Sequence, residues 1–226
     1  MLTRDRLRQC AAEAIGTFAL VFAGAGAVVI DAVTRGGVTH VGVALTFGLI
    51  IMSMIYAVGD VSGAHFNPAV TIGFWAARRL TGRAVLPYLA SQLAGALLAS
   101  AVLRVLFGNV ASLGATIPAG TAEQSLLLET LLTAVLMFVI LCVSTGPKEV
   151  GVMAGIAIGG VIALEALFAG PICGASMNPA RSIAPALVSG NLRALWVYII
   201  GPLVGSLVAV PCWRMTRGAC PPASAL

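Results

Sequence analysis

The sequence predicts an all-α integral membrane protein with six transmembrane helices and two re-entrant half-helices arranged as an inverted repeat. Two observations lead to this prediction. The 226-residue chain is 59% hydrophobic and only 9% charged, whereas soluble domains carry about a quarter charged residues. The tripeptide Asn-Pro-Ala also occurs twice, at residues 67–69 and 178–180, each time within apolar sequence at a point where a helix is expected to begin.

Six apolar segments are each long enough to cross the hydrocarbon core of a bilayer, which takes about 20 helical residues. They are expected at about 9–32, 38–59, 84–107, 124–144, 150–170 and 192–213. Two further stretches, 67–78 and 178–188, begin at the Asn-Pro-Ala motifs. They are too short to span, because twelve helical residues cover about 18 Å, so we expect half-helices that enter the membrane without crossing it.

The basic residues at the ends of the apolar segments predict the orientation of the chain. With six spans, nine of them fall on one side: Arg4, Arg6, Arg8, Arg78, Arg79, Arg83, Lys148, Arg214 and Arg217. Basic residues collect on the cytoplasmic side of a membrane. We therefore expect a multi-pass protein of the cell (inner or plasma) membrane with both termini in the cytoplasm. The net charge of +5 is then a topology signal, and nucleic acid is not an expected partner.

The two halves of the chain carry matching residues in the same order. The pairs are Glu13 with Glu129, Thr17 with Thr133, Gly42 with Gly155, Ala44 with Ala157, Tyr88 with Tyr198, and Gly95 with Gly205. Since each half has three spans, the second half enters the membrane from the opposite side. We expect inverted repeats, at about 9–107 and 124–213, within one channel-like domain of residues 1–226.

The Asn-Pro-Ala motifs predict the chemistry at the membrane centre. Each is expected to provide an N-cap, a first helical residue and the next helical residue: Asn67, Pro68 and Ala69 in one half, and Asn178, Pro179 and Ala180 in the other. The positive ends of two helix dipoles then meet at mid-membrane, where they oppose cations and protons but not neutral solutes. Each asparagine amide can cap with its oxygen and donate its N–H groups to the lumen.

Glu13 and Glu129 are carboxyl groups within apolar spans, so we expect them to face the protein interior with hydrogen-bond partners. The favoured interpretation is that each accepts N–H groups from the non-helical segment before a half-helix, and a proton relay is the alternative. His65 either lines the cytoplasmic half of a pore or is a packed histidine with its own partners.

No catalytic residue, cofactor or metal is expected. The chain contains neither GxSxG nor HExxH, and its five cysteines include no CxxC pair. Its two histidines, His40 and His65, lie at opposite ends of one span and are over 30 Å apart at ~1.5 Å per residue. An enzyme is therefore not expected.

The paired motifs SGAHFNPAV and GASMNPARS resemble those of the aquaporin (major intrinsic protein) family, and the resemblance runs from Glu13 to about Gly205. It implies a homotetramer in the lipid bilayer, with a pore for water and small neutral solutes in each subunit. It also implies an outer aromatic/arginine filter. Spacing from the motifs carries this filter over to Phe47, Ala166, Ala175 and Arg181.

Two positions depart from familiar patterns within the family. Strict water channels usually carry His at the position of Ala166, and glycerol facilitators usually carry Asp at the position of Ser182. Residues 42–74 and 177–202 most resemble the nodulin-26-like branch and its bacterial relatives, which are associated with water, glycerol and undissociated metalloid acids such as arsenious acid (arsenite).

We therefore expect a passive channel for such neutral solutes that excludes protons and ions. A strict water channel is the alternative, and a proton-coupled transporter using Glu13 or Glu129 is less favoured. Glu165, next to Ala166, either reaches the outer vestibule or packs against a neighbouring helix. In the vestibule it would orient Arg181 or provide an acceptor for polyhydroxylated solutes.

Overall fold

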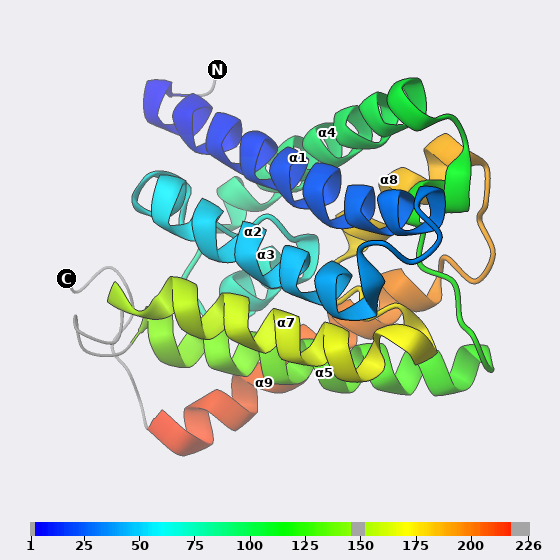
Figure 1. Cartoon of the computed structure of the whole chain (residues 1–226). Coiled ribbons are helices and arrows are strands. Elements are labelled where there is room, and N and C mark those ends of the chain that lie inside the picture. Colours follow the sequence, from blue (N-terminus) through cyan, green and yellow to red (C-terminus); the bar gives the residue numbers. More distant parts are fainter. Residues whose placement is uncertain (1–2, 146–151, 218–226) are drawn as a thin grey trace.

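Six helices of the computed structural model, which describes residues 3–145 and 152–217, are long and apolar enough to cross a membrane (Figure 1). They are α1 (Arg4–Val33), α2 (Thr39–Ser62), α4 (Gly82–Phe107), α5 (Ala122–Ser144), α7 (Ala154–Cys173) and α9 (Val197–Arg217). Within the described ranges the chain forms helices and no strands. The prediction of an all-helical membrane fold with six spans is confirmed.

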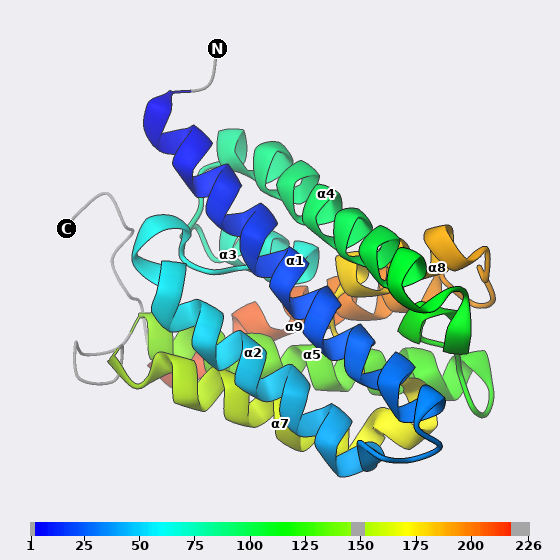
Figure 2. The ribbon, with the colours of Figure 1, turned by 45° about the horizontal axis from the view of Figure 1, so that its top comes forward.

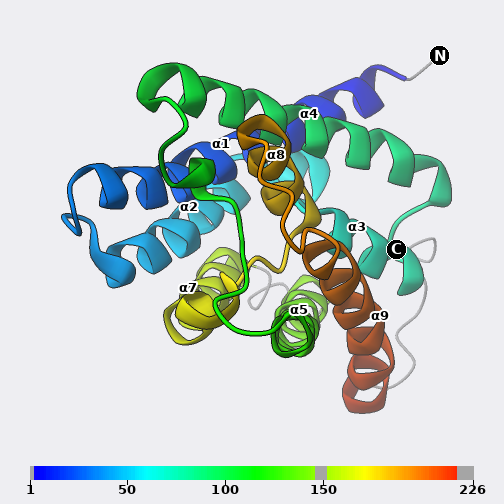
Figure 3. The same cartoon turned by 90° about the vertical axis from the view of Figure 1, so that its right-hand side faces the viewer.

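Two short helices, α3 (Pro68–Ala76) and α8 (Pro179–Ser189), begin at the prolines of the Asn-Pro-Ala motifs. They have nine and eleven residues, which is too short for a hydrocarbon core of about 30 Å. Viewed along the long helices, both lie between them, α8 nearer the viewer (Figure 3). A 3₁₀ turn, η1 (Val110–Gly114), lies in the connection between α4 and α5.

Three helices begin at residues several positions from the predicted ones: α1 begins earlier, and α7 and α9 begin later. α1 begins at Arg4 rather than near residue 9, because the side chain of Thr3 caps it by accepting the Arg6 N–H at 3.3 Å. α7 begins at Ala154 rather than near 150, and α9 at Val197 rather than near 192. Lys148, used to predict the orientation, lies outside the described residues.

The start of α1 and the end of α9 lie at the same end of the helix bundle, on the left in Figure 1. An even number of spans produces this arrangement, since each span carries the chain to the other side. Arg4 and Arg217 are therefore on one side of the bundle, as the distribution of basic residues predicts.

The long helices pack in pairs, α1 on α4, α5 on α9 and α2 on α7 (Figure 2). Glycines permit the first two pairs to approach closely. A methyl group on Gly95 would lie 2.1 Å from the Ala14 carbonyl oxygen, and one on Gly205 would lie 2.2 Å from that of Thr130. Small residues at such crossings allow backbones in a membrane to touch, and these two glycines are a matched pair in the sequence.

We predict that Gly95→Ala destabilises the protein by about 1–3 kcal/mol, because the new methyl group must push α1 away from α4. Gly160→Ala is the matched control, since a methyl group there meets nothing within 4 Å. The control should be neutral or slightly stabilising. Thermal unfolding in detergent measures both, and equal midpoints for the two variants would contradict the tight crossing.

Candidate functional site

Two non-helical loops connect the long helices to the half-helices and have the same backbone geometry. Gly63 caps the C-terminus of α2 and Gly174 that of α7, in left-handed conformations with φ of 83° and 86°. Beyond each glycine, alternate residues also have positive φ: Ala64 (51°), Phe66 (50°), Ala175 (41°) and Met177 (53°). Such conformations are unfavourable for residues with a side chain, so surrounding contacts must hold both loops.

The carboxylate of Glu13, fully buried on α1, holds the first loop. Its oxygens accept the N–H groups of His65 and Phe66 at 2.9 and 2.7 Å. They also accept the Ser62 hydroxyl at 2.7 Å and the Gln92 side-chain amide at 2.8 Å. Backbone donors that hydrocarbon would leave unsatisfied are therefore paired within the protein.

Glu129, fully buried on α5, has the corresponding role in the second loop. Its oxygens accept the N–H groups of Ser176 and Met177 at 2.8 and 2.7 Å. In each half a tyrosine hydroxyl donates to the carbonyl of the last residue of the long helix: Tyr88 to Ser62 at 2.8 Å and Tyr198 to Cys173 at 2.7 Å. The bonds from loop N–H groups to Glu13 and Glu129 are those that the favoured interpretation of the two glutamates expects.

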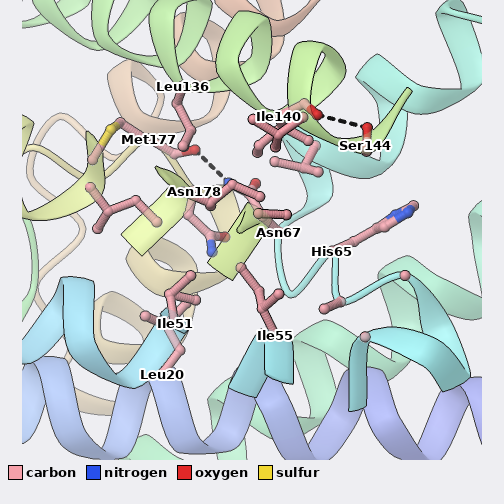
Figure 4. Close-up of a pocket in the computed structure, with 18 of the residues that line it drawn as sticks. Leu20, Ile51, Ile55, His65, Asn67, Leu136, Ile140, Ser144, Met177 and Asn178 are labelled. Atoms are coloured by element: carbon pink, nitrogen blue, oxygen red, sulfur yellow. Dashed lines mark hydrogen bonds between the residues drawn. The ribbon is translucent and has the colours of Figure 1, made fainter. Parts of the chain in front are cut away.

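Asn67 connects its half-helix to the opposite loop. Its side-chain oxygen accepts the Ala69 N–H at 2.8 Å, which is the expected N-cap. Its amide nitrogen donates to the Met177 carbonyl at 2.7 Å, a bond drawn in Figure 4. One of its two amide hydrogens is therefore used between the loops, whereas the sequence suggested that both would serve the lumen.

Asn178 makes the reciprocal contacts. Its side-chain oxygen accepts the N–H groups of Ala180 and Arg181 at 3.0 and 3.3 Å. Its amide nitrogen donates to the Phe66 carbonyl at 2.9 Å. Each asparagine thus caps its own helix and fastens the other loop, which holds the starts of α3 and α8 together.

A cavity of about 560 Å³ runs alongside these two asparagines, which both line it. Its walls are largely apolar. Figure 4 shows the two asparagines between Leu20, Ile51 and Ile55 on one side and Leu136 and Ile140 on the other. A second cavity, of about 440 Å³, is lined by residues such as Asp31, His40 and Thr116.

Three side chains line both cavities: Phe47, Ala166 and Arg181. They therefore lie at the boundary between the two spaces. Ala175 lines the larger cavity beside them. The structure brings together all four residues that spacing assigns to the filter, although they come from α2, α7, the second loop and α8.

Arg181 is 4% exposed, and its guanidinium is fixed by two contacts. One nitrogen donates to the Gly114 carbonyl at 2.7 Å, and the guanidinium carbon lies 5.0 Å from the centroid of the Phe47 ring. Attraction to the face of the ring favours this cation–π position. Within the described residues no carboxylate forms an ion pair with Arg181, so its charge is directed at the cavities rather than neutralised by a partner.

His65 combines both of the roles considered for it. It lines the larger cavity, its Nδ1 lies 3.1 Å from the Thr71 hydroxyl, and its ring stacks on Phe74 at 4.6 Å. Glu165, in contrast, is 3% exposed and contributes to the walls of neither the larger nor the second cavity. One of its carboxyl oxygens is buried without a hydrogen-bond partner.

The sequence alone did not indicate the residues that support Glu13 and Arg181. Gln92 bridges Glu13 and the Thr71 hydroxyl, the latter at 2.9 Å. The carbonyl of Gly114 reaches Arg181 from the connection between α4 and α5. A backbone carbonyl has no sequence signature, and the position of that connection depends on the finished fold.

Cysteines and potential metal ligands are dispersed. Cys10, Cys142, Cys173 and Cys212 are free thiols, and Cys220 lies outside the described residues. Over residues 3–145 and 152–217, no group of three or more His, Cys, Asp or Glu side chains is placed to hold a metal ion.

The family model described as Major intrinsic protein matches residues 1–213. The chain belongs to the major intrinsic protein family. It is 48% identical over 212 residues to Aquaporin NIP1-1 from Oryza sativa subsp. japonica, covering 93% of this chain and 75% of the relative. It is 42% identical over 212 residues to Nodulin-26 from Glycine max, covering 93% and 78%. The resemblance to the nodulin-26-like branch is confirmed.

The X-ray structure of the aquaglyceroporin from Plasmodium falciparum shares the fold of this aquaporin-family chain, with a TM-score of 0.81. The match covers 98% of this chain and 100% of the other at 24% identity. The aquaporin-like fold expected from the sequence is therefore confirmed, in a family of membrane channels for water and small solutes.

We predict that Glu129→Gln destabilises the protein by about 1–3 kcal/mol. The two loop N–H groups bond different carboxylate oxygens, and glutamine would turn an NH₂ donor toward one of them. Glu123→Gln is the control, since Glu123 is exposed on the same helix and should change stability by less than about 0.5 kcal/mol. Thermal unfolding in detergent compares them, and an unchanged Glu129→Gln midpoint would show that the carboxylate does not hold the loop.

Proposed function

We propose that this protein is a passive channel for water and small neutral solutes, among them glycerol and undissociated metalloid acids such as arsenious acid. One observation carries the proposal. Two cavities meet at Phe47, Ala166 and Arg181, so that a single constriction separates spaces on either side of it. A solute moving between the cavities must pass these three side chains.

The arrangement supports exclusion of ions and protons by two devices. The N-termini of α3 and α8 carry partial positive charge from their dipoles and are held together by Asn67 and Asn178. Arg181 adds a full positive charge at the constriction. A cation entering the pathway meets both, whereas a neutral hydroxylated solute can accept hydrogen bonds from the guanidinium.

The small side chains proposed for the constriction support solutes larger than water. Two of its proposed side chains, Ala166 and Ala175, are alanines, which add little bulk opposite Phe47 and Arg181. The similarity to the aquaglyceroporin fold and to nodulin-26-like relatives is in keeping with this range. A strict water channel is the alternative, and it needs a narrower passage than these alanines provide.

A proton-coupled transporter based on Glu13 and Glu129 has less support. The carboxylate of each glutamate is buried and occupied by backbone N–H donors of a loop. Neither side chain lines the two cavities that meet at the constriction. A proton carrier must exchange protons with the pathway, whereas these groups serve as structural acceptors.

The proposal includes the cellular setting of the channel. The chain acts as one domain, residues 1–226, whose inverted repeats at about 9–107 and 124–213 each contribute one half-helix. Its termini face the cytoplasm of an inner or plasma membrane, and four copies form a homotetramer with one pathway per subunit. The exposed apolar side chains of the long helices, such as Leu49 and Leu164, provide an outer surface for lipid and neighbouring subunits.

Stopped-flow light scattering of proteoliposomes tests the function. An osmotic gradient should drive water flux well above that of empty vesicles with a low activation energy, and glycerol and arsenite uptake should exceed the empty-vesicle rate. Water flux without solute uptake would favour the strict water channel. Flux equal to that of empty vesicles would refute the channel.

We predict that Ala166→His reduces glycerol flux about tenfold, equivalent to about 1.4 kcal/mol of added barrier, and reduces water flux much less. The imidazole would fill space beside Phe47 and Arg181. Phe168→His is the control, because Phe168 is exposed on the outer surface of the same helix. Unchanged glycerol flux in Ala166→His would show that Ala166 is not at the constriction.

A further inference from the structure

His40, near the start of α2, forms a hydrogen bond across to α7. Its Nε2 lies 2.8 Å from the carbonyl oxygen of Leu167. A carbonyl oxygen can only accept, so Nε2 carries the hydrogen and donates it. The bond joins the helix that carries Phe47 to the residue directly after Ala166.

The carbonyl of Leu167 is free to accept this bond because of a proline. In an α-helix each carbonyl accepts the N–H of the residue four positions later. For Leu167 that residue is Pro171, which lies within α7 and has no N–H. Gly170 provides space for the imidazole, since a methyl group there would lie 2.8 Å from the ring.

The His40 bond is the outermost of three contacts that fasten α2 to α7. At the second, a methyl group on Gly48 would lie 2.4 Å from the Gly159 carbonyl oxygen, so the two backbones touch. At the third, the Tyr56 hydroxyl donates to the carbonyl of Val152, two residues before α7, at 3.2 Å. The contacts advance along α2 as they go back along α7, which means that the helices are antiparallel.

Phe47 and Ala166 lie between the first and second of these contacts. Phe47 precedes Gly48 on α2, and Ala166 precedes Leu167 on α7. Beyond Leu167, the end of α7 is held by other elements: the Ile172 carbonyl accepts the Ala119 N–H at 3.0 Å, and the Cys173 carbonyl accepts the Tyr198 hydroxyl at 2.7 Å. The separation of the two helices at the constriction therefore depends on the contact of Gly48 with Gly159 and Ala163 on one side and on His40 on the other.

We propose that His40 is a specificity-determining positioning residue: by donating to the carbonyl that Pro171 leaves open, it holds Ala166 at a fixed distance from Phe47. This inference rests on the proposed function, in which these two side chains line the constriction. Without the bond, the stretch of α7 between Gly159 and Ile172, which carries Ala166, moves away from α2, and the passage admits larger neutral solutes more readily.

Permeability measurements on His40 variants in proteoliposomes test the proposal. His40→Ala should raise the ratio of glycerol to water permeability about threefold, as expected for loss of one hydrogen bond made by an exposed side chain. His40→Gln keeps an amide N–H donor and should restore most of the wild-type ratio. A wild-type ratio in His40→Ala would overturn the proposal.

Repeating His40→Ala in a Pro171→Ala protein shows whether His40 acts through its hydrogen bond or only by filling space in the second cavity. In Pro171→Ala the new residue supplies the missing backbone N–H, which bonds the Leu167 carbonyl within α7 in place of His40. Pro171→Ala alone should therefore raise the permeability ratio about as much as His40→Ala does. His40→Ala should then leave the permeability ratio of the Pro171→Ala protein nearly unchanged. An equal threefold rise in both backgrounds would show that the imidazole acts only by filling the second cavity, and would overturn the proposal.

Thermal unfolding in detergent provides a readout that does not depend on transport. It compares the wild type, His40→Ala, Pro171→Ala and the double variant. His40→Ala should lower the midpoint in the wild-type background and leave it nearly unchanged in Pro171→Ala. If His40→Ala lowers the unfolding midpoint equally in both backgrounds, the His40 bond does not fasten α7 to α2, even where the channel conducts as proposed. Wild-type vesicles that conduct neither water nor glycerol would refute the proposed function, while the unfolding comparison would still decide whether His40 fastens α7 to α2.

Discussion

A chain that leaves the helical conformation inside a membrane exposes backbone N–H groups where no water is present to accept them. In this protein two buried carboxylates, Glu13 and Glu129, accept those groups, one in each half. The charge of a carboxylate makes it a strong acceptor, and several short bonds to one group hold a loop whose residues have unfavourable positive φ. The remaining features of the pathway depend on these loops keeping their shape.

The loops in turn place the asparagines, and the asparagines join the two halves. Because Asn67 donates to the second loop and Asn178 to the first, neither half-helix can shift without breaking a bond to the other. Arg181 follows Asn178 by three residues, so the position of Asn178 determines where the Arg181 backbone lies. Gly114 and Phe47 then fix its guanidinium. A rigid passage results from hydrogen bonds, while its apolar walls give passing solutes few partners to bind.

Much of this arrangement could be predicted because it is encoded locally. Apolar segment length predicts the six spans, and an Asn-Pro pair in apolar sequence predicts each half-helix, since both signals follow from backbone hydrogen bonding. Contacts that depend on the assembled fold could not be predicted. Gln92 beside Glu13, the Gly114 carbonyl on Arg181 and the His40 bond to Leu167 join segments between 67 and 127 residues apart. Hydropathy also gave helix ends several residues from the observed ones, because α1 continues into polar sequence beyond its apolar segment.

In the proposed function, two loops held by carboxylates form a path that conducts neutral molecules and excludes protons. Both properties can be measured in one preparation of proteoliposomes that contain a pH-sensitive dye. Light scattering under an osmotic gradient measures water flux, and the dye measures proton entry while a potassium gradient and valinomycin set the membrane potential. We expect water flux far above that of empty vesicles and proton entry no faster than in empty vesicles. Proton entry that rises in proportion to the amount of protein, or water flux that follows the imposed pH gradient, would contradict it.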